Sequence, residues 1–325
     1  MDPTTPGPWA RPIGAPTEEY EPVPPEDAAI PWIDVHQHTQ SLTWNDREAF
    51  GLSGARATVM IAASYYWSPY RPVSAEDVRF LWDDALRRAD AFARTHPYEQ
   101  CVAVGVHTWS RVEGWESLVE ALPAYCELDR VVAIGETGIA ATQHTSPWPL
   151  ADQRDLLRAE FRVADRTGLP VLLHTPGLSK GSMSALDAAR YEEANASFAD
   201  PVLAPETAKE DAIEIDLTVA EEVGLDEEQL VVDHAVPEVA PTVLETTDAW
   251  LAFSVRSIDA TDIAPVVEEY GPDRILIDTD LAGASDADPF KMKRTVLDLL
   301  RLGVPSEDVR RVVYENPCEL LGLEP

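Results

Sequence analysis

Short apolar runs alternate with longer amphipathic segments along the chain from Ile30 onward. The runs are rich in Val and Ile, a composition typical of parallel strands that are buried on both faces. Eight strands are predicted in this way, at residues 32–35, 57–62, 102–106, 131–134, 169–173, 230–232, 250–253 and 275–277. The chain is therefore expected to consist of repeated βα units.

The amphipathic segments predict helices between these strands, at residues 75–94, 115–122, 150–167, 208–223, 259–270 and 289–302. Gly168 and Gly271 lie where two of the helices should end, and Ser306 is expected to cap a last short helix. Eight βα units imply a closed (β/α)8 TIM barrel. An open doubly wound sheet would need a Gly-rich phosphate loop after a strand, and the sequence contains no GxGxxG or Walker pattern.

Two segments depart from this repeat. Residues 1–28 are rich in proline and have no apolar periodicity, so we expect an extended N-terminal arm, followed by the barrel domain at 29–325. The segment between His174 and Leu230 is much longer than a plain βα connection needs. Its residues 182–196 are compatible with a helix, and we expect this strand-five to strand-six excursion to cover the barrel mouth.

The charge balance is strongly acidic. Asp and Glu number 58 against 25 Lys and Arg, which gives a net charge of −33, and only four of the basic residues are lysines. Such a surface repels phosphate backbones, so nucleic-acid binding is disfavoured. It is not excluded, because a screened acidic surface can still carry a metal-lined groove. The same profile is typical of cytosolic proteins from high-salt cells, where ions screen charges within about 3 Å at 1 M.

Other features of the composition concern the compartment. No apolar run approaches the roughly 20 residues that cross a membrane, and the N-terminus lacks a basic segment followed by an apolar one, so a cytoplasmic protein is expected. Cys101, Cys126 and Cys318 are widely spaced and form no CxxC pair. We expect them to be reduced and mostly buried thiols.

Candidate chemistry is concentrated where the apolar runs end. Active sites of TIM barrels lie at the C-terminal ends of the strands, so side chains at these positions should converge. His96 and His144 do not follow a predicted strand and are expected to be surface or loop residues. The residues that do follow predicted strands are His36, His38, His107, Glu136, His174, His234, Asp278 and Asp280.

Imidazoles combined with carboxylates favour Zn, Mn, Fe, Ni or Co over Ca as the bound divalent metal. The set is too large for one tetrahedral ion and would serve two ions about 3.5 to 4 Å apart, with one carboxylate as a bridge. We therefore expect one or two divalent ions, and the sequence does not distinguish Mg from the other metals. Aromatic residues near strand ends could line the substrate pocket, namely Trp44, Tyr65, Tyr66, Trp67 and Trp109.

Seven short strings, in their order and spacing, resemble the TatD family of metal-dependent hydrolases in the amidohydrolase superfamily. The resemblance runs from about residue 32 to the C-terminus. The strings are DVHQH at 34–38, VGVHTW at 104–109, VAIGETG at 132–138, LPVLLHT at 169–175, VVDHA at 231–235, RILIDTD at 274–280 and ENP at 315–317.

The resemblance implies a role for each candidate residue. His36, His38, Glu136 and Asp280 would hold one ion, while Glu136, His174 and His234 would hold the other. His107 would lie in the pocket without being a ligand, and Asp280 would also take a proton from the metal-bound water. The catalytic residues would thus be Asp280, Glu136 and His107.

The sequence departs from the family pattern at three places. His174 is followed by Thr175-Pro176-Gly177 where the family usually has an Arg-containing stretch, which puts DNA backbone binding in doubt. The Cys-Phe-Ser-Gly string that often follows the strand-six histidine is replaced by residues 235–238, AVPE. Asp278 and Asp280 share a face by strand alternation, so either could be the strand-eight ligand.

We therefore expect a hydrolase in which a water bound to one or two divalent ions attacks a phosphoester, ester or amide bond. One alternative is a DNA exonuclease like the best-known TatD proteins. The other is a non-catalytic barrel that binds a small molecule or a partner. The substrate and the oligomeric state stay open.

Overall fold

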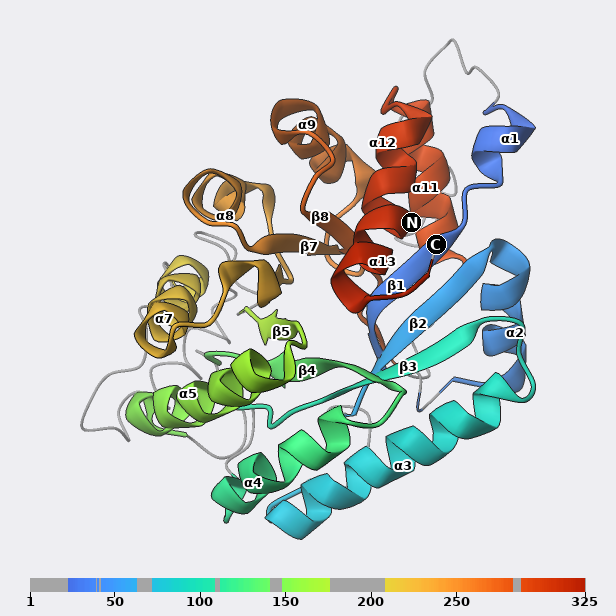
Figure 1. Ribbon diagram of the computed structural model, residues 1–325. Coiled ribbons are helices and arrows are strands. Elements are labelled where there is room, and N and C mark those ends of the chain that lie inside the picture. Colours follow the sequence, from blue (N-terminus) through green and yellow to red (C-terminus); the bar gives the residue numbers. More distant parts are fainter. Residues whose placement is uncertain are drawn as a thin grey trace, which may run out of the picture.

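Eight parallel strands, each except β8 paired with the next strand along the chain, form the centre of the molecule (Figure 1). The computed structural model describes residues 23–38, 40, 42–62, 72–108, 112–140, 148–175, 208–282 and 288–324. The strands are β1 (Trp32–His38), β2 (Ala55–Ile61), β3 (Glu99–Val104), β4 (Val131–Thr137), β5 (Val171–His174), β6 (Leu230–Asp233), β7 (Trp250–Ser254) and β8 (Ile275–Asp278). All eight predicted strands are confirmed, with shifts of a few residues at their ends.

A short ninth strand closes the sheet. β9 (Leu281–Ala282) follows β8 closely and pairs in parallel with the end of β1, where Gln37 lies opposite Leu281 and His38 opposite Ala282. The sheet therefore returns to its first strand, and the predicted TIM barrel is confirmed. This closure brings the C-terminal end of β8 beside the two histidines of β1.

Helices surround the strands (Figure 1). The six predicted helices are confirmed as α3 (Ala75–Ala93), α4 (Trp115–Cys126), α5 (Leu150–Thr167), α7 (Ala208–Val223), α9 (Ala260–Tyr270) and α11 (Lys291–Arg301). Gly168 and Gly271 end α5 and α9 as expected. Ser306 is the first helical residue of α12 rather than its cap, which is Pro305.

Several further segments were not predicted by apolar periodicity. They are α1 (Pro25–Ala28), α2 (Trp44–Ser53), α8 (Ala240–Thr246) and α13 (Asn316–Leu321), the 3-10 turns η2 (Glu227–Gln229) and η3 (Pro237–Val239), and the π-helical segment η4 (Arg311–Glu315), which joins α12 (Ser306–Arg310) to α13. Most of them are short, so their apolar pattern has too few repeats to be recognised. Some precede the first strand or follow the last one and the others connect strands, so they do not change the order of the barrel.

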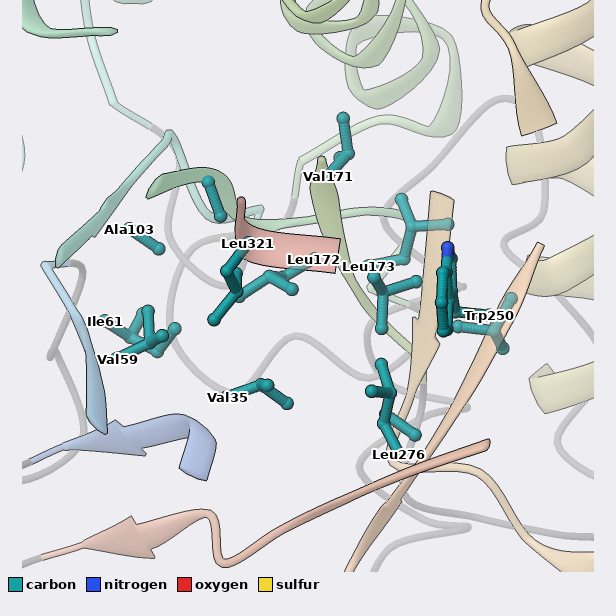
Figure 2. Packing of buried hydrophobic residues seen from close by; sticks show 14 of the residues in the cluster. Val35, Val59, Ile61, Ala103, Val171, Leu172, Leu173, Trp250, Leu276 and Leu321 are labelled. Atoms are coloured by element: carbon teal, nitrogen blue, oxygen red, sulfur yellow. The ribbon is translucent and has the colours of Figure 1, made fainter. Parts of the chain in front are cut away.

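The hydrophobic core follows from the alternation of side chains along the strands. On β1, Ile33 and Val35 belong to the main apolar cluster, while His36 and His38 lie on the opposite face. Figure 2 shows part of this cluster, to which strands from β1 to β8 and Leu321 of α13 contribute. Every residue of β1 is buried, so its polar residues lie inside the barrel rather than in solvent.

Some expectations concern residues outside the described ranges. They include the proline-rich arm up to residue 22, the helix expected at 182–196, His144, Tyr65, Tyr66, Trp67 and Trp109. The three cysteines are free thiols, with Cys101 and Cys318 buried and Cys126 half-buried. Among the described residues, the helices are all too short or too polar to cross a membrane.

Candidate metal centre

The carboxylate of Glu136, at the C-terminal end of β4, is the hub of the site. Its Oε1 accepts from Nδ1 of His174 in a short contact and lies 3.0 Å from Nε2 of His234. Its Oε2 lies 3.4 Å from Nε2 of His107 and 3.8 Å from Nε2 of His36. Four imidazoles therefore face one buried carboxylate. They come from the C-terminal ends of four strands, or from residues that follow those ends.

A second group of donors lies at the junction of β1 and β8. Nε2 of His36 is 3.3 Å from Nε2 of His38, and Oδ1 of Asp280 lies 3.8 Å and 3.4 Å from these two nitrogens. Two imidazole nitrogens that face each other and a carboxylate oxygen need a shared proton or a shared cation between them. This geometry fits a divalent ion.

The structure thus brings together all six residues expected to hold metal, and His107 lies with them. Three sets of donor atoms are close enough to share an ion: His36, His38 and Glu136; His107, Glu136 and His174; and His36, Asp233 and His234. Glu136 occurs in two of the sets. The donor chemistry is therefore compatible with more than one cation around this carboxylate.

Two of these residues have left-handed backbone conformations. The φ angle is 53° at His234 and 42° at Asp280, values that only a few per cent of non-glycine residues adopt. The amide of His234 donates to Oδ1 of Asp233 at 2.5 Å, and the amide of Asp280 donates to the carbonyl of His36 at 3.0 Å. These bonds hold both side chains at the barrel mouth.

Buried polar residues behind the donors fix their orientation. Asp233 accepts from Nδ1 of His36 in a short contact, so Nε2 of that imidazole faces the site. The Ser254 hydroxyl lies 2.8 Å from Nδ1 of His234 and 2.8 Å from Oδ1 of Asp278. In His36 and His234 alike, Nδ1 is engaged in this way, so Nε2 is the nitrogen available to a metal.

Asp34 links the first and last strands under the site. It is fully buried and accepts from the Thr279 amide at 3.1 Å, from the Thr279 hydroxyl at 2.5 Å and from the His36 amide at 3.3 Å. Thr279 is the residue before Asp280, so Asp34 positions both His36 and Asp280. Sequence reasoning missed Asp34, although its place two residues before His36 puts it on the same strand face.

The family model described as TatD related DNase matches residues 33–322. The chain belongs to the TatD family. An uncharacterized metal-dependent hydrolase from Methanocaldococcus jannaschii is 26% identical over 287 residues, which are 87% of this chain and 97% of that protein. The chain is thus a metal-dependent hydrolase of the TatD type, which favours an enzyme over a non-catalytic barrel.

Solved structures share the fold. A TatD-like protein from Archaeoglobus fulgidus aligns with 90% of this chain and 100% of its own, with a TM-score of 0.61 and 21% identity. A phosphotriesterase homology protein from Escherichia coli, complexed with phosphate in its active site, aligns with 90% of this chain and 99% of its own, with a TM-score of 0.56 and 13% identity. Both support the barrel assignment for this TatD protein.

Electrostatics in this TatD site favour a cation. Burial raises the pKa of Glu136, but the neighbouring imidazoles of His174 and His36 lower it further, so the net pKa is well below its usual range. The pKa of Asp280 falls to about 2, because its bond with His38 and nearby imidazoles outweigh burial. Burial lowers the pKa of His174 to about 4. Ionised carboxylates and neutral imidazoles are the forms that bind metal.

His36 indicates how negative the site is. Burial lowers its pKa, but the charges of Glu136 and Asp233 raise it well above the usual value. An environment that stabilises an imidazolium so strongly also stabilises a metal cation at the same place.

Two further expectations concern residues away from the site. His96 lies in the loop between α3 and β3, as expected of a loop residue, but it is buried, and its ring packs among those of Phe92 and Tyr98. Trp44, at the start of α2, lies 4.7 Å from the ring of His96 and is 54% exposed. Trp44 therefore covers this aromatic cluster on the outside of the barrel and has no contact with the metal centre.

Proposed function

We propose that this TatD protein binds two divalent cations that share Glu136. His36, His38 and Asp280 would complete the donors on one side, and His174 and His234 those on the other. The single observation that carries this proposal is the position of Glu136, which faces different imidazoles with each carboxylate oxygen: His36 and His107 with Oε2, His174 and His234 with Oε1. Bound divalent cations would supply an acidified water and a Lewis acid at the scissile bond.

The protein's own residues supply proton transfer and orientation. Asp280 would be the base: its Oδ1 accepts one proton of the attacking water, the water oxygen forms the new bond, and Asp280 then returns that proton to the leaving group as the scissile bond breaks. Nη1 of Arg256 lies 3.1 Å from the other oxygen, Oδ2, and so keeps Oδ1 turned towards the histidines. His107 is buried beside Oε2 of Glu136, where its imidazole would orient the scissile group.

The substrate bond is a phosphoester, ester or amide, and phosphoesters are the first to test. The phosphate in the active site of the E. coli structure supports this order, because that barrel has the same fold. A DNA exonuclease is the second candidate, supported by the description of the family as TatD related DNase. The net charge of −33 and the missing Arg after His174 weigh against DNA.

Hydrolysis of labelled single-stranded DNA across a salt series separates these two candidates. Affinity that depends on phosphate contacts falls steeply as salt rises. We expect DNA cleavage to be slower than hydrolysis of a small phosphoester at every salt concentration. Faster cleavage of DNA would favour the exonuclease.

The metal proposal is tested with Glu136→Gln. A neutral amide cannot bridge two cations with the charge that a carboxylate supplies, so metal content and hydrolytic activity should fall together. Metal is measured in the purified protein by mass spectrometry, and activity with a panel of phosphoesters, esters and amides. Glu120→Gln, on the exposed face of α4, is the matched control. A Glu136→Gln protein with full metal content and normal turnover would refute the proposal.

A further inference from the structure

Lys209 is a fully buried lysine beside the metal centre. It is the second residue of α7, which lies beside α5 near β5 (Figure 1), and its side chain is 0% exposed. A buried ammonium is costly unless hydrogen bonds compensate it. Its Nζ donates to the Thr175 hydroxyl at 2.8 Å and to the carbonyl of His234 at 2.7 Å. No sequence pattern singles this residue out.

These bonds lie where the pairing of β5 with β6 stops. The last paired residues are His174 and Asp233, and the next ones along each strand are Thr175 and His234. The Lys209 ammonium joins these two residues, and the Thr175 hydroxyl donates in turn to the carbonyl of Asp233 at 2.5 Å. Lys209 therefore links the strand ends just beyond the last backbone pair.

The linked strand ends carry two of the proposed ligands. His174 and His234 both contact Oε1 of Glu136, and their ring centroids are 4.8 Å apart. The left-handed backbone of His234 needs support on both sides of the residue. Asp233 binds its amide, and Lys209 binds its carbonyl.

We propose that Lys209 is a positioning residue that holds His174 and His234 at the spacing required for a shared divalent cation. This inference rests on the proposed ligand set. The sign of the effect distinguishes it from a purely electrostatic role. A positive charge near a cation site weakens metal binding by repulsion, so removing that charge alone would strengthen binding. Loss of a positioning residue has the opposite effect.

The test is Lys209→Met, which keeps an unbranched side chain of similar length but removes the charge and the donors. Binding of Zn²⁺ and of Mn²⁺ to metal-free protein is measured by calorimetry at molar KCl. We expect affinity to fall by about 10- to 100-fold, the usual effect of losing a residue that orients metal ligands. Lys293→Met is the control, because Lys293 also donates to a backbone carbonyl, that of Ile30 at 3.4 Å. Ile30 lies before the start of β1, whereas the proposed ligands lie at the other end of that strand.

Thermal unfolding of the metal-free variants separates positioning from general stability. A merely structural role would lower the melting temperature of Lys209→Met and leave the metal affinity of the folded protein unchanged, which would overturn the proposal. Unchanged or tighter binding at any melting temperature would also overturn it.

Thr175→Val provides a second variant should Lys209→Met fail to fold. It removes the hydroxyl between Lys209 and Asp233 but keeps the side-chain shape and the bond from Lys209 to His234. We expect a smaller fall in affinity, and wild-type affinity would contradict the proposal. If the wild-type protein itself binds no divalent cation, the proposed function fails as well, an outcome distinct from a defect confined to the variants.

Discussion

Asp278 and Asp280 are two carboxylates at one strand end with different surroundings. Asp278 is fully buried, and its Oδ1 accepts from the Ser254 hydroxyl at 2.8 Å and from the Asp280 amide at 3.1 Å. Burial, together with the charge of Asp233, raises its pKa well above the usual value. Asp280 faces the histidines of β1 and has a pKa of about 2. These contacts favour a supporting role for Asp278 and are compatible with the proton transfer proposed for Asp280.

Replacing each aspartate by asparagine tests this division. Asp280→Asn removes the proposed base and the charge of a proposed ligand, so kcat should fall by about 10²- to 10⁴-fold. Asp278→Asn keeps the carbonyl oxygen that accepts from Ser254, so we expect a much smaller loss. Steady-state kinetics with the best substrate, at saturating metal, gives both values. A larger loss for Asp278→Asn would reverse the assignment.

At the residue scale, the sequence predicted which side chains meet but not how they are supported. Histidines and carboxylates after apolar runs were recognisable because barrel strands end on one side. Strand alternation could not separate Asp278 from Asp280, because it places residues two apart on the same face. The left-handed φ of Asp280, which breaks this alternation, is visible only in the structure. Lys209 was not recognisable because its partners are backbone and hydroxyl groups on other elements.

Helix α5 holds the segments that follow β3 and the end of β4. Oε1 of Glu160 accepts from the Val106 amide at 2.7 Å, and Oε2 accepts from the Thr137 hydroxyl at 2.5 Å. Val106 precedes His107, and Thr137 follows Glu136. Burial raises the pKa of Glu160 from 4.5 to about 8, although both hydrogen bonds oppose this change. Glu160 thus holds the chain neighbours of two site residues.

The raised pKa predicts a pH dependence of stability. Between pH 4.5 and about 8 the folded protein retains the Glu160 proton and the unfolded chain releases it. Stability contributed by this group is therefore complete below pH 4.5 and is lost as the pH rises to about 8, by at most about 1.4 kcal/mol per pH unit. Glu160→Gln cannot titrate, so its free energy of unfolding should fall less over this range.

Urea unfolding of both proteins from pH 5 to 8, at constant KCl, measures the difference. The other titrating groups are common to the two proteins and cancel. Parallel stability curves would show that Glu160 does not carry the proton.

At the element scale, periodicity predicted the barrel because each long helix and each strand buries one regular face. It failed for α2, which buries only Phe50 and Ser53, so its apolar pattern is too sparse to be seen. The capping box formed by Thr43 and Asp46 was a signal that could have located its start. The sequence could not show that β8 ends before a separate strand β9, because the two residues of β9 are too few to form a recognisable pattern.

For the whole molecule, the dominant property is the negative charge. Several arginines pair with acids one helical turn away, such as Arg87 with Asp84 and Arg301 with Asp298, and exposed pairs of this kind add little stability. The chain has only four lysines, of which Lys209 is buried, and its 58 acidic residues outnumber its 25 basic residues by 33. Like charges therefore remain uncompensated over the surface.

Stability should increase with salt. Lowering the ionic strength from 1 M to 0.1 M lengthens the Debye length from about 3 to 10 Å, which brings more like-charge pairs into range. We expect the melting temperature to rise along a KCl series at fixed pH and metal concentration. Sucrose at matched osmolality is the control, because it stabilises by exclusion without screening charge. A melting temperature that stays flat or falls as KCl rises would show that the acidic composition is not an adaptation to a high-salt cytosol.

The most direct test of the central claim locates the metal itself. Crystals loaded with Mn²⁺ or Zn²⁺ are measured near the absorption edge, and an anomalous difference map gives the ion positions. We predict peaks on both sides of the Glu136 carboxylate, within about 2.0 to 2.2 Å of its oxygens for zinc, one towards the β1 histidines and the other towards His174 and His234. Fully loaded crystals whose peaks lie only on the acidic surface, with none beside Glu136, would contradict the account.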